Sequence, residues 1–186
     1  MPAGTPNAGT PPIRCVAVVE TVQTTTLVRL PPEASRQLPS RGQVAVRGEL
    51  EGQEFDTVLE PDGRGGHWLR LSPALLAATA TTAGDPVSLA VRPSREWPEP
   101  QVPQDLVAAL LAGPGAVQGA WRDITPMARW EWVRWVNATR NPATLERRVE
   151  VSVSKLGKGM RRPCCFDLSA CTDPDLARSG KLPEPA

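Results

Sequence analysis

The feature that most constrains the fold is a short motif that occurs twice in the first half of the chain, 41 residues apart. Arg29–Ala34 (RLPPEA) aligns with Arg70–Leu75 (RLSPAL). Proline in each copy suits the first turn of a short helix, and the glycine that follows (Gly42 or Gly84) suits a left-handed cap. A strand–helix–strand unit cannot bury its apolar face alone, so the motif predicts two copies closed around a pseudo-twofold axis. Chance similarity of composition is the alternative.

Short apolar and β-branched runs, separated by turn signals, predict six strands between residues 13 and 97. Val44–Leu50 (VAVRGEL) alternates strictly, as a half-buried strand does, and a turn follows at Glu51-Gly52. The glycine-rich run of residues 62–66 could cradle a phosphate, but it lacks the Lys-Ser/Thr of a P-loop and favours a hairpin turn. The predicted strands are Ile13–Glu20, Thr25–Leu30, Val44–Leu50, Glu54–Glu60, His67–Leu71 and Val87–Val91, and the predicted short helices are Glu33–Leu38 and Ala74–Ala80.

The second half of the chain predicts helices. Thr125-Pro126 and Asn141-Pro142 each combine an N-cap residue with a first-turn proline, which predicts helices over residues 126–139 and 142–156. Their short connection predicts an antiparallel hairpin. Pro103–Ala112 predicts one further short helix. The fold class is therefore α+β: a small pseudo-twofold split β-barrel with a C-terminal antiparallel helical hairpin.

Helical periodicity predicts which side chains of the hairpin are buried. On the first helix Trp132, Val133 and Val136 share one face, flanked by Trp130 and Trp135. On the second helix the apolar positions are spaced to form one stripe. That stripe consists of Leu145, Val149, Val153 and Leu156, and the side chains expected toward solvent are Met127, Glu131, Arg134, Arg147 and Glu150.

Tryptophan and basic residues crowd together between residues 121 and 162. This stretch holds four of the six tryptophans, and ten Lys and Arg against four Asp and Glu, so it carries +6 whereas the whole chain carries +1. Such a segment could bind nucleic acid, with cations on phosphates and indoles stacked on bases. The helical spacing of the tryptophans favours packing in a core instead. A third reading places an anionic or peptide-like ligand at the seam between barrel and hairpin, and we rank it just above nucleic acid.

Several segments resemble two known families. Leu30-Pro31-Pro32, residues 43–56, residues 61–69 and residues 84–87 resemble the DUF1905 domain, a small split β-barrel of unassigned function. Downstream, the helical region looks like the bacteriocin-protection, YdeI/OmpD-associated family, whose name refers to protection against antimicrobial peptides. That second resemblance rests on Trp135-Val136, Ala138, Arg140, Thr144, Arg147-Arg148-Val149 and Leu156.

The second resemblance is incomplete at three positions. Thr139 stands where the family usually has lysine, Ala143 where it favours an acid, and Leu145 where it favours arginine. The resemblance implies an uncharacterised bacterial protein that acts as a binding or stress-protection module, and it implies no defined chemistry. If those polar groups form the family's site, this chain has lost part of it.

Length and composition set the expected organisation and location of the chain. No apolar run approaches the roughly 20 residues that span a bilayer, so we expect no membrane insertion. The first twelve residues have neither a basic flank nor an apolar core, which predicts a cytoplasmic protein without a secretory signal. The expected segments are a disordered N-terminus at 1–12, the barrel at 13–97, the helical region at 98–162 and a cysteine-containing tail at 163–186.

Residues that could support catalysis are few. His67 is the sole histidine, so a Ser-His-Asp or Cys-His mechanism would have to use it, and no partner is placed by the sequence. A structural or surface role for His67 is favoured, and with it a non-enzymatic protein. An enzyme that uses the cleft between barrel and hairpin, with His67 and nearby arginines, stays open as an alternative.

Three cysteines near the C-terminus are candidates for a metal site, against the alternative that they are small buried thiols. They are Cys164, Cys165 and Cys171, and a fourth ligand would have to come from His67 or from another chain. We predict no cofactor, and the sequence indicates no oligomeric state. The candidate ligand-binding residues are His67, Trp68, Trp135, Arg140, Arg147 and Arg148.

Overall fold

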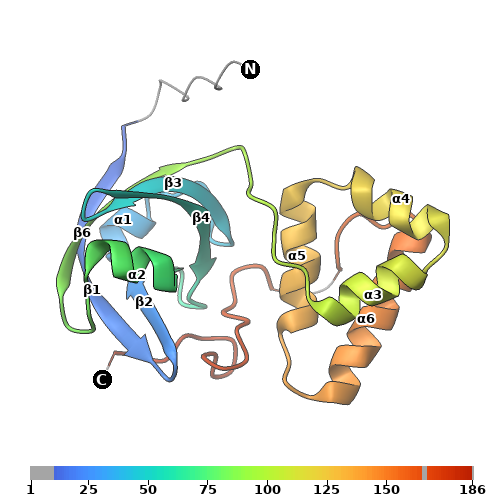
Figure 1. Ribbon diagram of the computed structural model, residues 1–186. Helices are drawn as coiled ribbons and strands as arrows, with labels where there is room; N and C mark the ends of the chain where they lie inside the picture. The colour runs from blue at the N-terminus through green and yellow to red at the C-terminus, as the bar shows by residue number, and fades with distance from the viewer. Residues whose placement is uncertain (1–10, 165–166, 186) are drawn as a thin grey trace. The chain divides into compact units, whose positions relative to one another are not determined.

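The computed structural model describes residues 11–164 and 167–185, which form two compact units (Figure 1). The barrel unit contains residues up to Glu60 together with Gly66–Glu96, and the helical unit contains Pro61–Gly65 together with the chain from Trp97 onward. The disorder predicted for residues 1–12 lies, for residues 1–10, outside the described residues.

Six antiparallel strands close into a barrel in the order β1-β2-β5-β4-β3-β6, which confirms the predicted fold class (Figure 1). Val44–Leu50 forms the strand that its alternation predicts, and the other strands differ from prediction by one to two residues at their ends. The strands are β1 (Ile13–Val22), β2 (Thr25–Arg29), β3 (Val44–Leu50), β4 (Gln53–Pro61), β5 (His67–Arg70) and β6 (Pro86–Pro93).

The barrel core consists of alternate residues of each strand together with two short helices. Along β3, Val44, Val46 and Leu50 are buried in the core, whereas Arg47 and Glu49 between them are exposed. The helices α1 (Pro32–Ser35) and α2 (Pro73–Thr79) close the core by adding apolar side chains to it. Ala34 of α1 and Leu75 and Leu76 of α2 belong to the core, and so does Leu38 in the turn after α1.

The strand registers reproduce the 41-residue offset of the repeated motif. Val28 pairs with Leu69 across β2 and β5, and Glu49 pairs with Ala90 across β3 and β6, each pair being 41 residues apart. Exchanging the two copies therefore maps both pairs onto themselves, and it also preserves the strand order of the barrel. A pseudo-twofold axis runs through these two pairs. The flanking pairs exchange with one another: Leu27–Arg70 with Arg29–Trp68, and Gly48–Val91 with Leu50–Leu89.

Turn residues follow the prediction at one position and depart from it at another. Glu51 and Gly52, which join β3 to β4, have φ angles of 49° and 79°, as a two-residue hairpin turn of type I′ requires. The prediction that glycine caps both short helices was wrong. The left-handed residue at the end of α2 is Ala80, with φ 52°, and Gly84 lies in the following turn. The end of α1, at Arg36, is right-handed.

The helical unit contains four helices in its described residues, one more than predicted. The additional helix, α4, begins after Pro114, and its proline and its buried Val117 are the signals that the sequence offers for it. Helix α6 contacts each of the other three, so it lies at the centre of this unit. The helices are α3 (Gln104–Ala112), α4 (Gly115–Asp123), α5 (Pro126–Asn137) and α6 (Pro142–Gly157).

The prediction that Glu131 and Arg134 face solvent was wrong, because both are only 7% exposed. The Glu131 carboxylate pairs with the Arg162 guanidinium, and this hydrogen bond raises the pKa of Arg162. Arg134 donates to the carbonyl groups of Leu168 at 3.0 Å and Ala170. The segment after α6 therefore covers the face of α5 that periodicity assigned to water.

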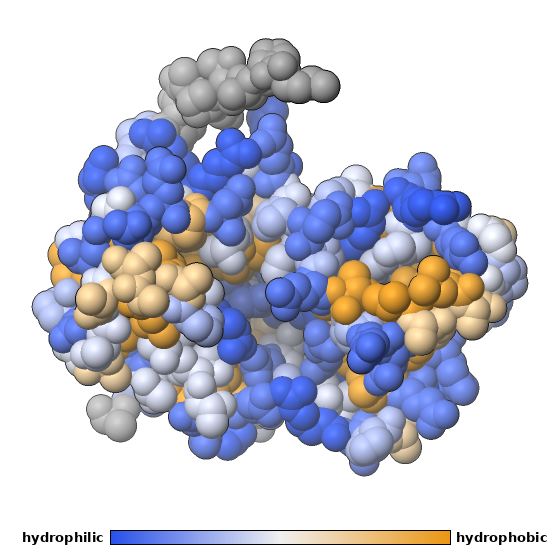
Figure 2. Space-filling model, viewed as in Figure 1, coloured by the Kyte–Doolittle hydropathy of each residue, from blue (hydrophilic) through white to orange (hydrophobic). Residues whose placement is uncertain are grey.

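After α6, the residues that the structure describes form turns and a short bridge between Arg178 and Lys181. Leu176 and Leu182 are fully buried, and the Leu182 amide donates to the Asp62 carbonyl at 2.8 Å. Helix α3 exposes two apolar side chains, Val107 and Leu111. Figure 2 shows an orange strip where α3 lies in Figure 1. Among the described residues, no helix has the length and apolarity that crossing a membrane requires.

Candidate ligand-binding site

His67 lies in the barrel core, and both of its ring nitrogens are hydrogen-bonded. Nε2 is 2.9 Å from the Gly42 carbonyl oxygen, which can only accept, so Nε2 carries the proton. Nδ1 then accepts from the Ser35 hydroxyl at 2.6 Å. With an exposure of 1%, this arrangement fits the structural role favoured for His67.

Replacing Ser35 by alanine tests that role. We expect the change to lower the free energy of unfolding by about 1–2 kcal/mol, because it leaves the buried Nδ1 of His67 without its donor. Chemical denaturation of the barrel measures the loss, and Ser88→Ala, at an exposed serine of β6, is the matched control. Unchanged stability in Ser35→Ala would contradict a structural role for His67.

The other candidate from the barrel, Trp68, is also buried. It points away from the core, since the alternation of β5 places its neighbours His67 and Leu69 inside. The Arg70 guanidinium lies 5.4 Å from the centre of its ring, on the same side of the strand. The exposed surface of Trp68 is 1%, so its indole presents almost no area to solvent.

The candidates from the helical unit divide into one cluster and two surface pairs. Trp135 is half-buried, with the Arg148 guanidinium 5.5 Å and the Lys155 ammonium 5.9 Å from the centre of its ring. Arg148 also donates to the Trp135 carbonyl at 2.7 Å, and burial lowers its pKa. Arg140 and Arg147 are exposed and lie in ion pairs. Arg140 pairs with Asp175, and this hydrogen bond raises the pKa of Arg140. Arg147 pairs with Glu150.

Most of the positive charge between residues 121 and 162 is engaged within the protein. Eight of the ten cationic side chains contact a carboxylate, a backbone carbonyl or a sulfur atom. Nucleic-acid binding needs cations that are available to phosphates, so these contacts weigh against it. The eight are Arg129, Arg134, Arg140, Arg147, Arg148, Lys155, Arg161 and Arg162.

The cysteines of the C-terminal segment give no metal site among the described residues. Cys164 is exposed and lies 3.0 Å from the Lys155 ammonium, whereas Cys171 is buried. Cys165 lies outside the described residues. No group of three His, Cys, Asp or Glu side chains that could hold a metal is present in the part of the chain that the structure describes.

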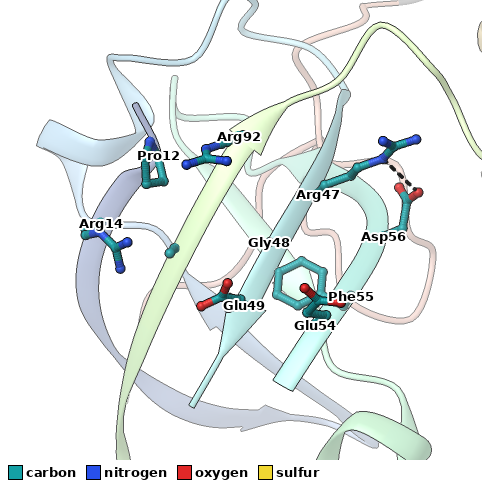
Figure 3. Close-up of a pocket in the computed structure, with 10 residues that line it drawn as sticks. Pro12, Arg14, Arg47, Gly48, Glu49, Glu54, Phe55, Asp56 and Arg92 are labelled. Carbon is teal, nitrogen blue, oxygen red and sulfur yellow. Dashed lines mark ion pairs between the residues drawn. The ribbon is translucent and has the colours of Figure 1, made fainter. Parts of the chain in front are cut away.

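The barrel unit contains a site that the sequence did not indicate: a groove on the outer face of the sheet formed by β1, β6, β3 and β4 (Figure 3). One part of it has a volume of about 480 Å³, and an adjoining part of about 490 Å³ shares Arg14, Glu49 and Ala90 with the first. We call this surface the barrel groove. Its other charged residues are Arg47, Arg92, Glu54 and Asp56.

Strand register explains how these residues come together. In one row across the sheet Arg14 is opposite Ala90, which is opposite Glu49, and Glu49 is opposite Glu54. In the next row of outward-facing residues Arg92 is opposite Arg47, and Arg47 is opposite Asp56. The alternation in the sequence identifies the outward-facing positions, but only the register shows which of them share a row.

The charges of the barrel groove differ in whether they have partners. Arg47 forms ion pairs with Asp56, at 3.5 Å, and with Glu96. Arg14 and Arg92 form no hydrogen bond or ion pair with any residue in the described ranges 11–164 and 167–185. Below the groove, burial raises the pKa of the half-buried Cys15 thiol, and the nearby charge of Glu33 adds to the effect.

Comparison with known families gives a match to each half of the chain. Residues 16–91 match the family described as "Domain of unknown function (DUF1905)", and residues 99–159 match the family described as "Bacteriocin-protection, YdeI or OmpD-Associated" (OmdA). Both resemblances are thereby confirmed. No curated protein gives a match to the chain.

Proposed function

Because the chain joins a DUF1905 domain to an OmdA domain, we propose that it is a non-enzymatic binding protein, with a role related to the bacteriocin protection that names the second family. Its ligand is small and anionic or peptide-like, and it binds in the barrel groove. This location replaces the predicted seam. The cytoplasm is the proposed compartment, since a reducing environment suits the Cys15 thiol.

One observation carries this proposal: the barrel groove holds two guanidinium groups, those of Arg14 and Arg92, that the described residues leave without an acid. Ala90 lies between Arg14 and Glu49 and is too small to fill the space above β6. A concave surface with a few convergent polar groups is the usual form of a small-ligand site. The predicted candidates His67 and Trp68 are buried, so they offer a ligand little surface.

Titration with a short peptide, trialanine, tests the groove. We expect backbone amide shifts in the NMR spectrum of the full chain to concentrate on β1, β3 and β6. The double variant Arg14→Gln/Arg92→Gln should weaken binding about fivefold or more, because each exposed charge contact contributes up to about 1 kcal/mol. Arg147→Gln, at an exposed arginine of α6, is the matched control and should change nothing.

Two results of this titration would overturn the proposal. One is the absence of amide shifts in the barrel at millimolar trialanine and with its end-capped forms. The other is a set of shifts confined to the four helices, which would place the ligand on Trp135 and its cations instead. Native mass spectrometry of the freshly purified chain adds an independent readout, since a retained ligand appears as extra mass.

A further inference from the structure

The two walls of the barrel groove carry opposite charges at the same level. Arg14 on β1 and Glu49 on β3 are both paired with Ala90 on the intervening strand β6. Figure 3 shows their charged groups on either side of that strand. Because neighbouring strands lie about 4.8 Å apart, the two backbone positions are separated by about 10 Å.

On the acidic side of the groove, like charges stand opposite one another. Glu49 and Glu54 are direct cross-strand partners on β3 and β4, and neither carboxylate has a hydrogen bond or ion pair with a residue of the described ranges. Opposed like charges destabilise a sheet. A cation placed between Glu49 and Glu54 would relieve that repulsion.

On the basic side of the groove, Arg14 and Arg92 lie on the neighbouring strands β1 and β6. Arg92 and Arg47 are direct partners on β6 and β3, and Arg47 already has two carboxylate partners. Arg92 has none among the described residues, and Arg14 is its diagonal neighbour on β1. An anion placed between Arg14 and Arg92 would be held by two guanidinium groups.

We propose that the barrel groove binds a dipolar ligand: a short peptide whose free carboxylate lies at Arg14 and Arg92 and whose free ammonium lies at Glu49 and Glu54. This inference rests on the proposed function and names its ligand class. Three residues in extended conformation span about 10 Å, which matches the separation of the two walls. A simple anion or a nucleic-acid backbone would meet the two acids as well as the arginines, and so fits the groove less well.

The two ends of the site differ because the side chains depart from the pseudo-twofold symmetry of the backbone. The axis passes between Glu49 and Ala90, and the 41-residue offset relates Arg92 to Glu51. Positions that the barrel's backbone makes equivalent therefore carry different charges. A ligand that lies across the axis meets a basic end and an acidic end, so it binds in one orientation.

End-capped tripeptides test this assignment on the full chain. Trialanine should bind more tightly than N-acetyl-trialanine, which lacks the ammonium, and more tightly than trialanine amide, which lacks the carboxylate, by about fivefold in each case. Glu49→Gln should abolish the preference for a free amine and keep the preference for a free carboxylate. Arg14→Gln should do the reverse, and Glu150→Gln on α6 should alter neither preference.

The outcomes separate this inference from the proposed function. If all three peptides bind the groove with equal affinity, the groove is a binding site but its ligand is not dipolar, and the inference is overturned. The inference also falls if Glu49→Gln and Arg14→Gln weaken all three peptides equally. If none of the peptides binds the barrel, both proposals fall together.

Discussion

Replacing Trp132 by alanine is expected to lower the free energy of unfolding of the helical unit by about 3–5 kcal/mol. Its indole is fully buried, packs edge-to-face on Trp135 with ring centres 6.1 Å apart, and donates to the Arg161 carbonyl at 3.1 Å. Alanine would leave a cavity and an unsatisfied carbonyl at once. Urea unfolding combined with amide hydrogen exchange, read separately for α6 and for the barrel strands, measures the loss.

Two further variants serve as controls for Trp132→Ala. Trp132→Phe keeps most of the ring but loses the hydrogen bond, and it should cost about 1–2 kcal/mol. Leu111→Ala, at a residue that is 69% exposed, should change stability little. If Trp132→Ala left stability intact and instead reduced retention on a nucleic-acid column, the tryptophans would be stacking surfaces rather than core.

The second large effect is expected at Gly48, where alanine should destabilise the barrel by about 3 kcal/mol. A Cβ atom at this position would lie 2.8 Å from the Phe55 ring and closer still to the Ala90 carbonyl oxygen. Phe55 is the cross-strand partner of Gly48 and packs against the barrel core. The backbone oxygen belongs to a paired strand and cannot move away without breaking the ladder.

Gly52→Ala provides the control for Gly48 within the same hairpin. No atom lies within 4 Å of a Cβ built there, but the φ angle of 79° penalises any side chain, so we expect a cost of about 1 kcal/mol. Thermal unfolding of the two variants side by side decides between crowding and backbone strain. A loss at Gly48→Ala no larger than the loss at Gly52→Ala would contradict the crowding expected at Gly48.

The barrel could be predicted from the sequence because its signals are local. The alternation of Val44–Leu50, the turn at Glu51-Gly52 and the prolines of the repeated motif each act over a few residues, and all three predicted the observed elements. The 41-residue offset also matches a long-range pairing, because Val28 and its strand partner Leu69 are equivalent residues of the two copies. The repeat in the sequence therefore corresponds to a twofold symmetry in the pairing of the strands.

Two of the failures, the exposure of Glu131 and Arg134 and the missed groove, depended on residues distant in the sequence. Periodicity assigned Glu131 and Arg134 to solvent because it considers one helix alone, whereas Arg162 and the backbone of the C-terminal segment cover them. The barrel groove was missed for a related reason. Arg14 and Glu49 are 35 positions apart in the chain, and only the pairing of both with Ala90 brings them into one row.

The symmetry of the barrel has an evolutionary consequence. If two separate half-length chains closed such a barrel, any groove on their shared axis would present each residue twice, once from each copy. Such a groove could not distinguish the two ends of a molecule lying across it. In a single chain the two copies mutate independently, as Glu49 and Ala90 illustrate. Fusion of the halves is therefore the step that allows the groove to evolve different residues for the two ends of a ligand.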